Sequence, residues 1–402
     1  MLALAGGVLV LTTAIAGSWY VFRASKPSVT STTAPKLTDT DTIVLADFTN
    51  TTGDSVFDDT LRQGLAVQLA QSPFLSLISD ERIHKTLRLM GQAADARLTP
   101  ELAGGVCERT GSAAVLEGSI GSLGSQYVLG LRAKRCDTGD ILDEEQAQAA
   151  RKEDVLTTLS EIATKFRARV GESLTTLEKH STPLPDATTS SLEALKAYST
   201  GLKVLDSSGP PAALPHVKRA TEIDPNFAMA FANLGILYSA IGESVSSIES
   251  TTKAYQLRDR ASAREKFFID FAYHRTVTGD LEKARQACEV WAQTYPRDMQ
   301  PHSLLSGALS VSFGKFETAE EEARKAMMLD PDHSFPYFNL AASYIYRDRL
   351  AEARSTLQRA SERKIDMPEL LYARFQIAFL ENDHTEMEGL AALGRERSGA
   401  QD

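Results

Sequence analysis

The chain has 402 residues, of which 43% are hydrophobic and 24% are charged, and its formal net charge at pH 7 is −10. These proportions are typical of globular protein, and the length is enough for two or three domains. The acidic balance, together with the lack of any run of five basic residues, argues against a nucleic-acid partner, which needs Lys and Arg concentrated on one face.

The first 22 residues carry no charge and are largely apolar. This run predicts a transmembrane helix over residues 1–23, with Trp19 and Tyr20 near the membrane interface. A signal peptide cleaved after Ala16 is the alternative, because a small residue also stands two positions earlier. The run lacks a charged start and is longer than the apolar part of most signal peptides, which favours the anchor.

A flexible linker is predicted for residues 24–41, which are rich in Ser, Thr, Pro and Lys. Residues 42–178 read as a small α/β domain, in which apolar runs alternate with amphipathic stretches. Strands are expected at 42–48, 74–78, 113–120, 126–134 and 141–149, and helices at 57–71, 80–90, 100–108 and 154–177. Cys107 and Cys136 fall in this domain, where they either form a disulfide or stay as two buried thiols.

Beyond a second linker at 179–190, small residues, aromatics and prolines recur at a spacing near 34. The matching positions are Gly201, Ala213, Ala220 and Pro225, then Phe231, Leu234, Gly235, Tyr238, Gly242 and Ala254, then Gly307, Gly314, Ala319, Ala326 and Pro331, and then Tyr337, Leu340, Ala341, Tyr344, Ala353 and Ala360. This period is typical of tetratricopeptide repeats, helix hairpins that complete their core by stacking.

About five such repeats and a degenerate cap are predicted for residues 191–394, followed by a disordered tail at 395–402. The third repeat fits the spacing only after about three extra residues near Ala261. The predicted architecture is therefore α+β and multidomain: an N-terminal transmembrane helix, a small α/β domain and an all-α tetratricopeptide-repeat solenoid.

The sequence shows no recognisable catalytic or metal-binding motif. Gly118, Gly121 and Gly124 are wrongly spaced for a kinase phosphate loop, and no catalytic loop or metal-binding pair of histidines is present. The acidic cluster at 54, 58 and 59 fits a helix cap better than a cation site, because carboxylates there complement the helix dipole. The sequence predicts no enzyme, no cofactor and no metal.

Inner helices of stacked hairpins line a concave groove, and two units place apolar and amide side chains there. The candidate partner groove comprises Met229, Ala232, Asn233, Ile236, Phe335, Phe338, Asn339, Ala342 and Ile345. Such a surface suits an extended or helical peptide. The alternative is that its aromatics only pack between repeats. Glu369 and Ala373 occupy the positions that grip a terminal carboxylate in some repeats, so that specificity is not expected.

The strand from Ile43 to Phe48 and the turn Thr49-Asn50-Thr51-Thr52-Gly53-Asp54 resemble the opening of the TolB-amino-terminal-like (FlgO-like) domain. The stretch from Gly111 to Gly118 resembles a later strand of that family. With the apolar span and the repeats, the arrangement is similar to the post-membrane half of bacterial membrane-bound serine/threonine protein kinases. The catalytic domain of that family is missing here. The resemblance implies an extracytoplasmic location, which agrees with a disulfide.

The leading hypothesis is a membrane-anchored, non-enzymatic sensor or scaffold whose repeats bind a protein or peptide partner. The alternatives are the regulatory half of a receptor-type kinase and a secreted envelope-assembly factor. The expected location is the inner membrane, crossed once, with the bulk of the chain periplasmic. By the positive-inside rule alone, Arg23 and Lys26 would instead leave the bulk in the cytoplasm. Whether the chain forms a homodimer is left open.

Overall fold

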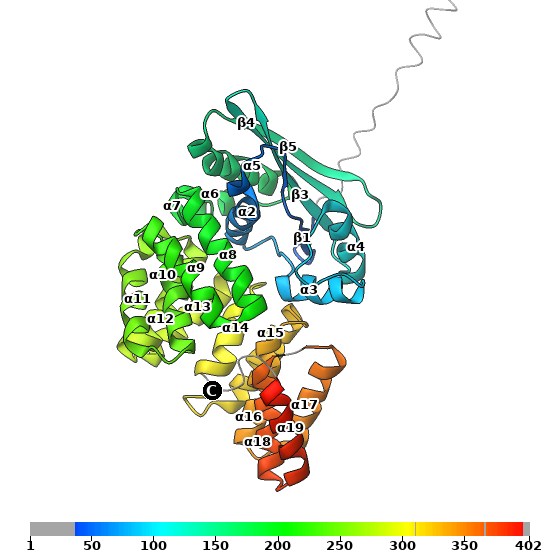
Figure 1. The fold of residues 1–402 in the computed structure, drawn as a ribbon, viewed down its shortest axis with the longest axis vertical. Helices are drawn as coiled ribbons and strands as arrows, with labels where there is room; N and C mark the ends of the chain where they lie inside the picture. The colour runs from blue at the N-terminus through cyan, green and yellow to red at the C-terminus, as the bar shows by residue number, and fades with distance from the viewer. Residues whose placement is uncertain (1–36, 310, 366, 397–402) are drawn as a thin grey trace, which may run out of the picture. The chain divides into compact units, whose positions relative to one another are not determined.

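The computed structural model describes residues 37–309, 311–365 and 367–396 (Figure 1). The predicted transmembrane helix at 1–23, residues 24–36 of the first linker and most of the predicted tail lie outside these residues. The described chain begins with a sheet and its covering helices and continues into a stack of helical hairpins. The small α/β region and the helical repeats expected from the sequence are thus both present.

The sheet has five strands in the described residues, in the order β1-β3-β4-β5, with β2 also paired to β3. The strands are β1 (Ile43–Leu45), β2 (Thr49–Asn50), β3 (Ala114–Leu123), β4 (Gln126–Arg135) and β5 (Ile141–Ala149). The first two run parallel to β3, whereas β3, β4 and β5 form an antiparallel meander. The β3–β4 hairpin turns at Gly124, whose φ of 63° favours glycine.

Helices cover both faces of this sheet. They are η1 (Ser55–Phe57), α2 (Thr60–Ala70), α3 (Asp80–Leu89), α4 (Pro100–Thr110), η2 (Lys152–Asp154), α5 (Val155–Val170), α6 (Leu174–Lys179) and α7 (Leu184–Ala187). Alternate residues of β1 point to opposite faces. Ile43 and Leu45 therefore join the core under α2 and α5, whereas Val44 joins a second core under α3 and α4.

The turn after β2 owes its shape to one amide. Asn50 Nδ2 donates to the Asp54 carbonyl and to Asp58 Oδ1, both at 2.9 Å, and its Oδ1 accepts from the Thr52 backbone at 3.0 Å. Gly53, with φ of 80°, completes the turn. The carboxylates of the acidic cluster have separate roles here: Asp54 accepts from Lys152 at 2.9 Å, whereas Asp59 starts α2 with a left-handed φ of 59°.

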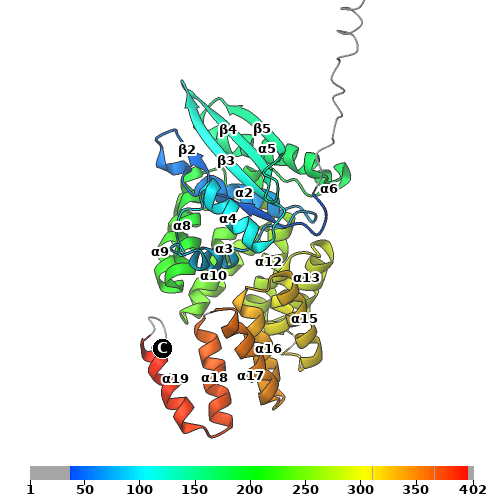
Figure 2. The ribbon, with the colours of Figure 1, turned by 90° about the vertical axis from the view of Figure 1, so that its right-hand side faces the viewer.

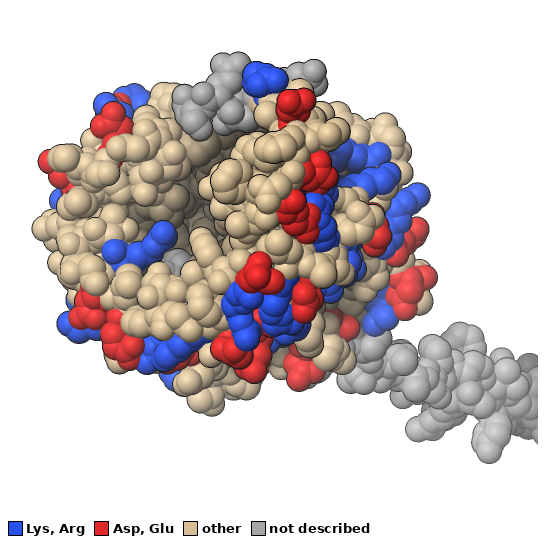
Figure 3. All heavy atoms as spheres, turned by 90° about the horizontal axis from the view of Figure 1, so that it is seen from below, with Lys and Arg blue, Asp and Glu red and all other residues tan. Residues whose placement is uncertain are grey.

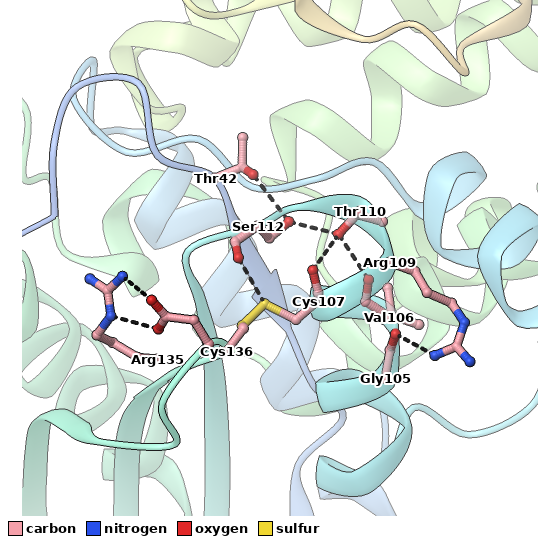
Figure 4. Close-up of a disulfide and its surroundings, with 10 residues drawn as sticks. Thr42, Gly105, Val106, Cys107, Arg109, Thr110, Ser112, Arg135 and Cys136 are labelled. Atoms are coloured by element: carbon pink, nitrogen blue, oxygen red, sulfur yellow. Dashed lines mark hydrogen bonds and ion pairs between the residues drawn. A yellow bond between two sulfur atoms is a disulfide. The ribbon is translucent and has the colours of Figure 1, made fainter.

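A disulfide joins α4 to the end of β4 (Figure 4). The Sγ atoms of Cys107 and Cys136 are bonded, and their Cα atoms are 6.0 Å apart. Around it, the Ser112 hydroxyl contacts those of Thr42 and Thr110 at 3.1 Å and 2.9 Å. This bond secures a helix of the second core to the antiparallel meander. Cys288 is a buried free thiol.

Three sequence expectations differ from the structure in and beside the α/β region. The strand expected at 74–78 forms only a single bridge, between Leu77 and Ile43. The long helix expected at 154–177 is broken at Gly171, where φ is 123°, so that α5 and α6 are separate. The segment 179–190, expected as a linker, contains α7 and buries Leu184 completely.

The remaining helices pair into hairpins, six of them in the described residues. Their bounds are α8 (Leu192–Ser208), α9 (Pro210–Ile223), α10 (Ala228–Ala240), α11 (Ser244–Gln256), α12 (Ala263–Tyr273), α13 (Leu281–Thr294), α14 (Met299–Leu304), α15 (Phe316–Leu329), α16 (Ser334–Tyr346), α17 (Leu350–Glu362), α18 (Pro368–Leu380) and α19 (His384–Glu396). Figure 2 shows the last four side by side. A Cβ at Gly235 would collide with Thr251 of the paired helix, which explains the small residue there.

Irregular turns account for the spacing fault in the third repeat. A 3-10 turn, η3 (Arg258–Arg260), stands between α11 and α12, where the extra residues near Ala261 were expected. The third and fourth inner helices then end in π-helical turns, η4 (His274–Thr278) and η5 (Leu305–Leu309). Each π turn accommodates one more residue than an α turn and so shifts the register of the following residues.

The predicted location, a single pass through the inner membrane with a periplasmic bulk, is contradicted. Across residues 37–309, 311–365 and 367–396, no helix combines the length and the apolar character needed to cross a bilayer. The apolar run at 1–22, on which that prediction depended, lies outside the described residues.

Candidate functional site

The inner helices of the hairpin stack and one edge of the α/β region enclose a cavity of about 950 Å³. Most residues of its repeat side come from α10, α12, α14 and α16, and the rest come from neighbouring helices and from the turns and loops between helices. Its α/β side consists of Thr42, the segment 76–79 and Arg82 at the start of α3. Figure 3 shows a hollow at the centre of the molecular face seen from below, with mostly uncharged residues around it. We call this cavity the inner groove.

Six of the nine residues predicted for the partner groove line the inner groove. They are Asn233, Ile236, Phe335, Phe338, Asn339 and Ala342. The other three do not line it. Ala232 is fully buried against α12, Ile345 belongs to the core of the last hairpins, and Met229 packs against the cores beside α10. These three lie on the helix faces that meet neighbouring helices, because successive residues of a helix turn by about 100°.

The two predicted amides line the inner groove, but their N–H groups are used within the stack. Asn233 Nδ2 donates to the Tyr198 hydroxyl at 2.7 Å and to the carbonyl of Met229 at 3.1 Å. Asn339 Nδ2 donates to the Ser303 carbonyl and the Ser306 hydroxyl, both at 3.0 Å. Each amide therefore links its own inner helix to the preceding one. Donors for a partner must come from other residues.

Arginines supply such donors. Arg264 is held by Asp298 at 2.6 Å, and Arg82 lies 3.7 Å from Asp332 while donating to the Thr110 carbonyl at 2.7 Å. Arg275 and Arg297 also line the inner groove, and no salt bridge among the described residues includes either of them.

Arg297 connects the repeats to the α/β region. Its Nη1 donates to the Phe74 carbonyl at 3.2 Å, and desolvation lowers its pKa below the ordinary value. Arg275 lies within η4, directly after α12, and its guanidinium is 6.0 Å from the ring centroid of Phe271. The Arg275 side chain is exposed. Both groups keep donor capacity that the described protein does not use for ion pairs.

A cluster around Asp332 joins α3 to the loop before α16. This carboxylate, whose side chain is 11% exposed, accepts from Lys85 of α3 and from Arg363 at 3.1 Å. Glu81 of α3 accepts from the Ser334 backbone at 3.1 Å and from its hydroxyl at 3.2 Å. Burial raises the pKa of Glu81 above its ordinary value. The α/β region is thereby attached to the loop before α16.

A second, smaller cavity of about 250 Å³ lies at the carboxyl end of β1. Arg62 fills part of it, 3.4 Å from Asp47 and 2.6 Å from Asp80. Desolvation raises the pKa of Asp47, whereas burial lowers that of His84. Within the described ranges, no three His, Cys, Asp or Glu side chains gather in a metal-binding group.

Sequence reasoning missed the basic residues and the α/β wall of the inner groove. Arg275 lies in the irregular third repeat and Arg297 directly after its second helix, where the 34-residue register holds only with about three extra residues. The segment 76–79 was expected as a strand, and nothing in its residues signals contact with helices more than 200 positions away. The irregular spacing of the third repeat could have drawn attention to Arg275, because this arginine lies in the same repeat.

No protein-family model matches this chain, and neither does any curated protein. Among solved structures, the C-terminal domain of LpoB from Salmonella enterica is 18% identical with a TM-score of 0.26, covering 30% of this chain and 87% of its own. PilW, described as a type IV pilus biogenesis factor, is 15% identical with a TM-score of 0.37. The match covers 52% of this chain and 96% of PilW. A thermophilic TPR protein of Thermus thermophilus is 20% identical with a TM-score of 0.35. The match covers 46% of this chain and 97% of the Thermus protein. Similarities at these TM-scores support no inference about function.

Proposed function

We propose that this chain is a non-enzymatic scaffold whose tetratricopeptide-type hairpins bind a protein or peptide partner in the inner groove. The observation that carries the proposal is the 950 Å³ cavity with apolar side chains left accessible in it. Ile236 is 42% exposed and Phe335 is 47% exposed. Removing apolar surface from water is favourable by about 25 cal/mol per Å², before the costs of association are subtracted. A polypeptide is the natural ligand for a groove that is long, mixed in polarity and lined by several helices.

The test compares matched substitutions on the inner and outer surfaces. Ile236→Gln and Phe335→Gln place polar amides in the inner groove. Val245→Gln and Met328→Gln make the same change on the outer helices α11 and α15, where the side chains are 70% and 82% exposed. All four variants replace an exposed apolar side chain, so that folding should be affected little and equally.

Each purified protein would be used to capture partners from an extract of its own source cells, and the captured proteins would be compared. The proposal expects at least one protein that the parent chain and both outer variants retain and both inner variants lose. Loss from the outer variants alone, or equal capture by all five proteins, would contradict binding in the inner groove.

For the α/β region, we propose membership of the TolB-amino-terminal-like family. Support comes from the hydrogen-bonded turn around Asn50, which gives each residue type of the matching motif a structural reason. Replacing Asn50 with Ala removes both of its donated bonds and should destabilise the region by about 1–3 kcal/mol. A urea midpoint unchanged from that of the parent chain would show that the motif match has no structural basis.

A further inference from the structure

The wall of the inner groove is more basic than the protein around it. Four arginines line it against two aspartates: Arg82, Arg264, Arg275, Arg297, Asp298 and Asp330. The balance of these groups is +2, in a chain whose formal net charge is −10. Arg264 pairs with Asp298, and Arg82 pairs with Asp332, which does not itself line the inner groove. Arg275 and Arg297 are the two lining arginines that no salt bridge among the described residues includes.

These two arginines stand at opposite ends of α12. Arg297 precedes Asp298, which binds Arg264 in the first turn of that helix, and Arg275 follows its last turn. A rise of 1.5 Å per residue from 264 to 275 separates the two ends by about 16 Å. An extended chain covers about 3.3 Å per residue, so that about five residues span this distance.

Apolar side chains from several helices also line the inner groove. Phe271 of α12 and Phe338 of α16 line it, together with Ile236 and Phe335, which keep 42% and 47% of their surface exposed. A ligand that places carboxylates at both ends and apolar side chains in the middle would satisfy all of these groups. Charge-assisted bonds from guanidinium to carboxylate are also about twice as strong as neutral ones.

We propose that the inner groove binds an extended acidic peptide with two carboxylates about five residues apart, held by Arg275 and Arg297, and apolar side chains between them. This proposal rests on the proposed function and names the chemistry of its partner. The segment 76–79 faces the same groove. The bound peptide therefore contacts the α/β region as well as the repeats.

A random dodecapeptide library displayed on phage is the probe, because it presumes no particular partner. The full chain serves as bait, together with Arg275→Gln, Arg297→Gln and the matched control Arg219→Gln. Arg219 lies on the outer helix α9, where its side chain is 65% exposed. Enriched peptides would be synthesised, and their affinities would be measured by fluorescence anisotropy at several salt concentrations.

The expected peptides carry Asp or Glu about five positions apart with aromatic or aliphatic residues between. Each inner arginine variant should weaken their binding about tenfold or more, whereas Arg219→Gln should leave it unchanged. Binding should also weaken as salt rises, because exposed charges are screened. Since Arg297 also contacts the α/β region, the exposed Arg275 provides the cleaner of the two tests.

Three outcomes would overturn the proposal. Enriched peptides that are neutral or basic, yet lose binding to Phe335→Gln, would refute the acidic specificity and leave the proposed function standing. A selection in which no peptide depends on Phe335 would refute the proposed function itself. Sedimentation velocity would show whether the chain self-associates. Self-association that is lost in Phe335→Gln would identify a second copy as the occupant of the groove.

Discussion

The buried ion pair between Arg167 and Glu172 should dominate the stability of the region where α5 meets the segment leading to the repeats. Both side chains are at most 1% exposed, and two bonds of 2.8 Å join the guanidinium to the carboxylate. Arg167 also donates to the His180 carbonyl at 2.9 Å, and Glu172 accepts from the Ser72 hydroxyl at 2.7 Å. The pair thus links α5, the end of α2 and the residues after α6.

Glu172→Gln keeps the shape of the side chain but leaves Arg167 charged, buried and facing an N–H group. Breaking a buried pair by removing one partner costs about 3–5 kcal/mol, because the remaining charge is uncompensated. Since each 1.4 kcal/mol changes an equilibrium tenfold, opening of α5 should become about 100-fold or more easier. The double change Arg167→Met with Glu172→Leu should recover part of this loss, because it leaves no unpaired charge.

Amide hydrogen exchange within α5 is the suitable assay, because it reports local opening without requiring the whole chain to unfold in one step. Glu178→Gln, an exposed glutamate on α6, is the matched control and should leave exchange unchanged. Exchange in Glu172→Gln that is accelerated less than about fivefold would refute the reasoning. So would a double variant that is less protected than the single one.

Three further predictions concern pH, redox state and packing. Burial raises the pKa of Glu265 to about 6 from 4.5, so the folded state binds the carboxyl proton more tightly than the unfolded state does. About 2 kcal/mol of stability, present below pH 4.5, is therefore lost as the pH rises through 6. The urea midpoint of Glu265→Gln should lack that change. Reducing the bond between Cys107 and Cys136, which are separated by 29 positions, should cost about 3–4 kcal/mol. The Tm should therefore fall in dithiothreitol, but not for the variant with both cysteines replaced by serine. Gly118→Ala should cost about 1–3 kcal/mol, because its Cβ would collide with an aromatic ring. Gly104→Ala, where no atom lies within 4 Å, should gain up to about 1 kcal/mol, and urea midpoints would compare the two.

The sequence by itself determined the local architecture. Its 34-residue period predicted stacked hairpins, because small residues recur wherever paired helices must approach, as Gly235 does beside Thr251. Apolar runs predicted strands, including those at 113–120 and 126–134, which pair as β3 and β4. Both patterns come from residues close together in the chain, because each indicates only which face of a single helix or strand is buried. The sequence also contains the cause of the break between α5 and α6, which is Gly171, although one continuous helix was expected there.

Only the tertiary structure decided what the inner groove contains. The bond from Lys85 to Asp332 joins residues 247 positions apart, and no periodic pattern encodes such a contact. That attachment places the α/β region against the repeats and adds Arg82 to the lining of the groove. Packing likewise brings the predicted ligand-binding amide of Asn339 within hydrogen-bond reach of Ser303, so that its N–H group is already used within the stack. The chemistry of a groove depends on which surfaces meet, and that is settled by contacts distant in sequence.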